Sequence, residues 1–184
     1  MPVLYKNQDV QKDHLVLSGN TAKKMHHGLT PNYGGATLEL HITIYGEPVP
    51  QGRPKFARIG GRVHTYDPEK SRNYKQLVRF WVTEHLKKIY GFKPLENAVC
   101  VDLTFYMPVP VSWTRKKRIE AINGTIRPVS KKAGDIDNLF KCVTDSCNGL
   151  LWVDDCIITD IHARKRYTGD IARTEMIVCE VKPC

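Results

Sequence analysis

Apolar and polar side chains alternate in three stretches of the chain, residues 38–45, 98–106 and 157–163. This alternation is typical of β-strands with one face buried. A turn-forming run at 167–170 follows the third stretch, so residues 174–181 are predicted to return as its antiparallel partner.

A hairpin and two helices complete the predicted elements. Short basic segments flank Gly60-Gly61 and predict the hairpin. Apolar residues then recur at helical spacing after Asp67-Pro68, an N-cap acceptor followed by proline, and Gly91 is the expected stop of this helix. A second helix is predicted from about Asp137 to Asn148. Its polar side carries Asp137, Lys141, Thr144, Asp145 and Asn148.

The order of these elements predicts a single α/β (α+β) domain, with a mixed β-sheet packed by two main helices. Residues 1–36 show no sustained periodicity, and we interpret them as an amino-terminal extension, flexible except where it rests on the body. The folded domain is then 37–184. No apolar run approaches the roughly 20 residues of a membrane span, and no signal peptide is recognisable, so we expect a cytoplasmic protein without a membrane partner.

The six cysteines do not have the spacing of a zinc site, because no Cys-x-x-Cys pair occurs. A disulfide framework is not expected either in a chain of 184 residues without a secretory signal. We therefore predict buried or unused thiols.

Charge is distributed unevenly along the chain. Residues 51–132 contain 18 basic and 6 acidic side chains, a net charge of +12, including the run Arg115-Lys116-Lys117-Arg118, which is predicted to form a short helix. Residues 133–184 contain 6 basic and 9 acidic side chains, a net charge of −3. A basic middle beside an acidic cluster suits a protein that holds a polyanion and brings a metal ion to it. A uniformly solvated basic surface is the plainer alternative.

Two pairs of carboxylates form that acidic cluster. Asp135 and Asp137 lie where the second helix should begin, and Asp154 and Asp155 precede the strand predicted at 157–163. Like charges at short range disfavour one another unless a cation lies among them. Since Mg²⁺ prefers hard oxygen ligands, we predict that the pairs converge on a divalent metal ion. Lys141, one helical turn after Asp137, favours phosphate chemistry over ion storage.

Each pair also has an ordinary structural interpretation. Aspartate is a common N-cap, which would account for one of Asp135 and Asp137, and the downstream pair could be turn residues. An EF-hand loop also begins with Asp-x-Asp, but Leu139 and Phe140 occupy positions that need an oxygen donor and a glycine, which excludes it.

The motifs occur in a recognisable order along about residues 38–181. They are Gly46-x-Pro48, Arg53-Pro54-Lys55, Thr65-Tyr66-Asp67-Pro68, Ser112-Trp113 before the basic run, Asp135-x-Asp137-Asn138-x-x-Lys141-x-x-x-Asp145, Asn148-Gly149 and Asp154-Asp155. This combination resembles the RusA family of Holliday junction resolvases, many of them encoded by phages or prophages.

The resemblance implies a homodimeric, Mg²⁺-dependent endonuclease, with Mn²⁺ as a substitute, that places paired symmetric nicks in four-way DNA junctions during recombination and repair. It implies Asp135, Asp137, Asp155 and Lys141 as catalytic residues. The three aspartates would bind the metal, with Asp154 as a further candidate ligand, and Asp145 and Asn138 would support them. The candidate DNA-binding residues are Arg53, Lys55, Arg58, Arg62, Lys116, Lys117, Arg118, Lys131 and Lys132.

Some family members carry a basic residue directly before the first aspartate, where this chain has Gly134. Lys131 or Lys132 is the expected replacement. Two other functions stay open on the same fold: a non-enzymatic DNA-binding or phage regulatory protein, and a Mg²⁺ nuclease that prefers flaps or forks.

Overall fold

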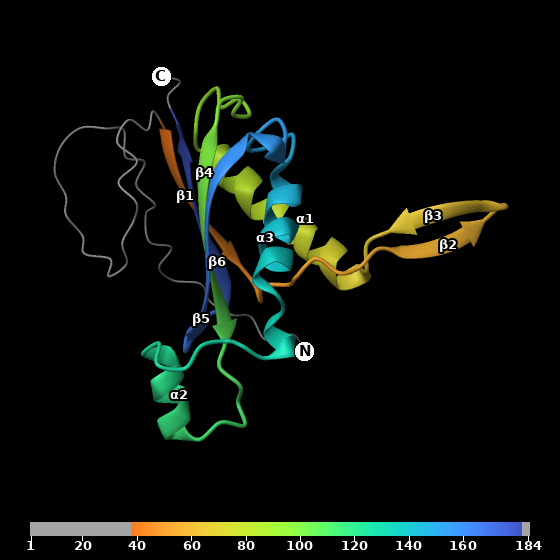
Figure 1. Cartoon of the computed structure of the whole chain (residues 1–184). Coiled ribbons are helices and arrows are strands. Elements are labelled where there is room, and N and C mark those ends of the chain that lie inside the picture. Colours follow the sequence, from red (N-terminus) through yellow and green to blue (C-terminus); the bar gives the residue numbers. More distant parts are fainter. Residues whose placement is uncertain (1–37, 182–184) are drawn as a thin grey trace, which may run out of the picture. The chain divides into compact units, whose positions relative to one another are not determined.

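The computed structural model describes residues 38–181, and the predicted extension at 1–36 lies outside them. The described part consists of a four-stranded mixed sheet, a separate two-stranded ribbon and three α-helices, whose elements are interleaved along the chain (Figure 1). This arrangement confirms the predicted α+β class. No helix in this part of the chain is long and apolar enough to span a membrane.

The main sheet has the strand order β1-β6-β4-β5. Its strands are β1 (Leu38–Tyr45), β4 (Val99–Pro108), β5 (Ile158–Thr168) and β6 (Arg173–Glu180). Strand β6 pairs antiparallel with both β1 and β4, while β5 pairs parallel with β4. The prediction that residues 174–181 pair with the preceding strand is therefore wrong. Strand β4 is buried on both faces over Val99–Phe105 and takes an interior position between β6 and β5, whereas the more exposed β5 lies at the edge.

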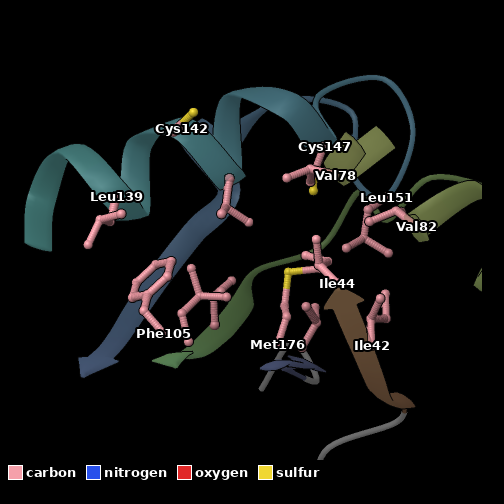
Figure 2. Close-up of a cluster of buried hydrophobic side chains, with 14 of the residues drawn as sticks. Ile42, Ile44, Val78, Val82, Phe105, Leu139, Cys142, Cys147, Leu151 and Met176 are labelled. Atoms are coloured by element: carbon pink, nitrogen blue, oxygen red, sulfur yellow. The ribbon is translucent and has the colours of Figure 1, made fainter. Parts of the chain in front are cut away.

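Helices α1 (Glu69–Leu86) and α3 (Ile136–Cys147) pack against each other and against the sheet. Figure 2 shows their apolar side chains meeting residues from β1, β4 and β6 in one hydrophobic core. The labelled members of this core are Ile42, Ile44, Val78, Val82, Phe105, Leu139, Cys142, Cys147, Leu151 and Met176. Helix α2 (Arg115–Ile122) instead packs on β5. Two 3-10 turns, η1 (Lys131–Ala133) and η2 (Asp155–Ile157), precede α3 and β5.

Two details of the helices differ from the prediction. The residue at the N-cap position of α1 is Pro68, without a side-chain capping bond, and α1 ends at Leu86, before the expected stop at Gly91. On α3, Thr144 is only 3% exposed rather than solvent-facing. Its hydroxyl donates to the carbonyl of Phe140 in the preceding turn, which allows a polar side chain to be buried.

The predicted hairpin is confirmed as the ribbon β2 (Lys55–Ile59) and β3 (Arg62–Tyr66). The cysteines of the described part are free, and four of the five are buried, as expected for unused thiols.

Candidate active site

The first turn of α3 presents two carboxylates. Asp135 occupies the N-cap position in an extended conformation, yet its side chain makes no capping hydrogen bond, and Asp137 follows in the first turn. Both are exposed, and neither side chain forms a hydrogen bond or an ion pair with any residue of the described part. The positive end of the helix dipole favours negative charge here. The ordinary capping interpretation therefore does not account for either aspartate, and their oxygens are available to a ligand.

The chain entering α3 is fixed from two sides. Gly134 has a φ of +71°, and a Cβ at this position would lie 2.7 Å from Cγ of Pro50, so only glycine fits. The ammonium of Lys165, on β5, donates a hydrogen bond of 2.7 Å to the Gly134 carbonyl. These contacts determine where Asp135 is placed.

Cations surround this helix start. Lys141 lies one turn after Asp137 and is exposed, without an ion pair in the described residues. Lys131 and Lys132 are exposed in η1, directly before α3. Half-buried Lys165 approaches from the sheet. An anionic ligand near the carboxylates would therefore meet several ammonium groups.

Asp145 and Asn138, the predicted supporting residues, connect α3 to its surroundings. The Asp145 carboxylate lies 3.4 Å from Nζ of Lys75, which also lies 3.0 Å from Asp67. The carbonyl of Asn138 accepts a hydrogen bond of 2.8 Å from the backbone of Gln51. Both contacts hold α3 against the segments on either side of the ribbon.

Asp154 and Asp155 do not converge with Asp135 and Asp137 within the described chain. No group of three His, Cys, Asp or Glu side chains in residues 38–181 is arranged to hold a metal ion. Backbone hydrogen bonds from Leu150 and Leu151 to Cys147 keep the chain at the C-terminal end of α3, and η2 follows there. Helix α3 has 12 residues, about 18 Å, so the two pairs lie towards its opposite ends.

Asp154 has a structural role. It is the N-cap of η2, and its carboxylate accepts a hydrogen bond of 3.0 Å from the backbone of Cys156. This bond lowers the pKa of Asp154. The turn interpretation thus accounts for Asp154 and leaves Asp155 as the candidate of that pair.

The residues present fit a Mg²⁺ ion held by two carboxylates. Mg²⁺ commonly takes one or two protein carboxylates and completes its shell with waters and substrate phosphate oxygens. Asp135 and Asp137 provide such a pair, exposed and free of competing hydrogen bonds.

Sequence reasoning missed three consecutive cations on β5, of which Lys165 faces α3 while Arg164 and Arg166 lie on the other face of the sheet. Burial and the like charges of Arg127 and Arg164 lower the pKa of the Arg166 guanidinium. Arg164 is paired with Asp102, whereas Lys165 reaches α3. The three consecutive basic residues 164–166 could have indicated these cations. The net negative charge of residues 133–184 as a whole pointed away from them.

The predicted DNA-binding residues are all exposed. Those of residues 53–62 lie on the ribbon or directly before it, and those of residues 116–118 lie on α2. Lys117 stacks its ammonium over the ring of Trp113 at 4.1 Å. Of these predicted DNA-binding residues, only Lys131 and Lys132 lie within a few residues of Asp135 in the chain.

Fold and site together define an α+β protein that presents carboxylates among basic groups, as an enzyme acting on a polyanion requires. The family model described as Endodeoxyribonuclease RusA matches residues 45–178. The chain therefore belongs to the RusA family of endodeoxyribonucleases. It is also similar to an uncharacterised protein of Bacillus subtilis (strain 168), YqaN, with 36% identity over 144 residues, covering 77% of this chain and 96% of that protein.

Proposed function

We propose that this protein is a Mg²⁺-dependent, structure-selective endonuclease that resolves four-way DNA junctions as a homodimer, by one nick in each of two strands. The observation that carries the proposal is the start of α3. Asp135 lies at the N-cap position without making a capping bond, and Asp137 follows it; both are exposed, and the cations around them form no ion pair with a described residue.

Asp135 and Asp137 would hold the ion. When bound, Mg²⁺ would supply a more acidic water and neutralise charge on the phosphate. Lys141 would donate hydrogen bonds to oxygens of the scissile phosphate from the same side of α3. A charge-assisted bond of this kind is roughly twice as strong as a neutral one.

Lys165 is the proposed second phosphate contact. Its hydrogen bond to Gly134 uses one of the three ammonium donors, and no other described residue takes the remaining two. The basic residue that some family members carry before the first aspartate is thus replaced by a cation from β5, in addition to Lys131 and Lys132.

Asp155 is the proposed third catalytic carboxylate, on the strength of the family resemblance. Because it lies at the other end of α3 in one chain, we propose that the partner subunit's Asp155 approaches Asp135 and Asp137. A two-fold axis that sets the two α3 helices antiparallel would give this arrangement at both sites.

A substrate panel tests the proposed function. Four-way, flap, fork and linear DNA of matched sequence would be incubated with the protein, with Mg²⁺ or with EDTA, and resolved on denaturing and native gels. We expect paired nicks in the four-way junction with Mg²⁺ alone. Retardation without a product would support the DNA-binding alternative, and preferential cutting of flaps or forks would support the other nuclease.

A further inference from the structure

The ribbon β2–β3 is largely exposed to solvent. Every residue of β3 is exposed, and each strand packs mainly against the other rather than against a helix or the main sheet. Figure 1 shows the ribbon extending from the body near the start of α1. Gly60 and Gly61 have φ values of +57° and +80°, which form its tight turn.

The ribbon carries only positive charge. Residues 51–66 contain no Asp or Glu and four Lys or Arg side chains. None of these four forms an ion pair with a described residue. Positive charge without internal acids is complementary to a polyanion, and a two-stranded ribbon is narrow enough to enter DNA grooves.

One face of the ribbon also exposes apolar side chains. Phe56 is opposite Thr65, and Arg58 is opposite Val63, so these four residues share one face. Phe56 is 71% exposed and Val63 is 60% exposed. Phosphate contacts alone do not require an exposed phenylalanine. An aromatic ring beside an arginine is instead the combination on which unpaired or unstacked bases stack.

The base of the ribbon is tied to α3. The backbone of Gln51 donates to the carbonyl of Asn138, and the Gln51 side-chain amide donates to Asp67 at 2.9 Å. The two ends of the ribbon are thereby linked to each other and to the residue next to Asp137. Phe56 is five residues from Gln51, about 17 Å of extended chain, a distance that spans about five base pairs.

We propose that Phe56 stacks on the bases exposed at the branch point of the junction, while Arg58 and Arg62 hold the flanking phosphates. The inference rests on the proposed function in that it takes branched DNA as the substrate. A branch point exposes the faces of base pairs, which a continuous duplex keeps stacked. The ribbon thus gives selectivity for branched over linear DNA, apart from the carboxylates that cut.

The test measures binding in EDTA, where no cleavage occurs. Dissociation constants would be determined for a four-way junction with 2-aminopurine at the branch point and for a linear duplex of the same sequence. For Phe56→Ala we expect about tenfold weaker junction binding with unchanged duplex binding, and loss of the fluorescence change that the wild type produces. Phe56→Trp should restore both. Tyr90→Ala is the matched control, because Tyr90 is fully exposed after α1.

Equal weakening of both DNAs, or an unchanged fluorescence response, would overturn the inference. So would a Phe56→Ala protein that changes its sedimentation, since the ribbon would then be a contact between subunits. A different result would contradict the proposed function. If the wild type binds junctions selectively but nicks no DNA with Mg²⁺, the proposed nuclease activity is wrong, whereas the proposed role of Phe56 still stands.

Discussion

At the scale of single residues, Gly134 connects the fold to the chemistry. Its positive φ and the contact with Pro50 fix the entry to α3, and its carbonyl holds the Lys165 ammonium. A cation from the last third of the chain is thereby brought next to a carboxylate pair 30 residues earlier.

Lys165→Met should reduce kcat for junction nicking by about tenfold or more with little change in KM, because the proposed second phosphate contact is lost. Single-turnover and steady-state cleavage measure both constants. Lys165→Arg should recover part of kcat. Lys93→Met, at an exposed position in the loop after α1, is the control. A loss confined to thermal stability, with kcat unchanged, would contradict the role.

The sequence predicted the positions of Asp135, Asp137 and Lys141 on α3, because helical periodicity is a local property. It did not predict Lys165, since a contact between β5 and the turn before α3 depends on how strands and helices pack. The sequence also could not show that the Asp135 side chain makes no capping hydrogen bond. An aspartate at an N-cap position looks the same in the sequence whether or not it makes that bond.

At the scale of elements, the contacts around α1 join the ribbon to α3. Asp67 was predicted as the N-cap of α1, but its carboxylate binds Lys75 and Gln51 instead. The hydrogen bond from Lys75 lowers the pKa of Asp67. Lys75 also lies beside Asp145 on α3, so one ammonium holds carboxylates from two segments.

This ion pair predicts a pH dependence of stability. A carboxyl whose pKa is lower in the folded state stabilises the fold above its unfolded pKa of about 4, and the contribution is lost as pH falls through the folded pKa. Lys75→Met should therefore lower the free energy of unfolding by about 1 kcal/mol at pH 7, and the difference from wild type should shrink below about pH 4.

Urea unfolding at several pH values measures this difference. Lys87→Met is the matched control: within the described part, exposed Lys87 pairs only with the partly exposed Glu84 near the end of α1, so its loss should change stability little. A difference between Lys75→Met and wild type that stays constant down to pH 2.5 would contradict the pairing with Asp67.

The sequence predicted which segments form strands, but it did not predict the order of those strands in the sheet. Alternation located β1, β4, β5 and β6 to within a few residues, except that β5 continues to Thr168. The turn after β5 suggested a hairpin, but β6 passes over to lie between β1 and β4. Pairing is a competition among all strands, and it is decided by burial of both faces of β4 rather than by the local turn.

At the scale of the whole molecule, the separation of the two carboxylate pairs leads to a test of the dimer. Asp137→Asn and Asp155→Asn should each abolish nicking. If the partner subunit's Asp155 completes the site, heterodimers of the two variants contain one intact site each. Co-expression with two different tags isolates these heterodimers, and we expect single nicks in each junction rather than pairs. Heterodimers as inactive as either variant alone would contradict a shared site.

The most direct measurement of the central claim compares Asp137→Asn with the wild type on one four-way junction. Binding is followed in EDTA and nicking with Mg²⁺, with Glu96→Gln as a control at an exposed acid in the loop before β4. We expect unchanged junction affinity, because the basic surface is intact, and a loss of nicking of about 100-fold or more. An Asp137→Asn protein that nicks junctions at the wild-type rate would contradict the account.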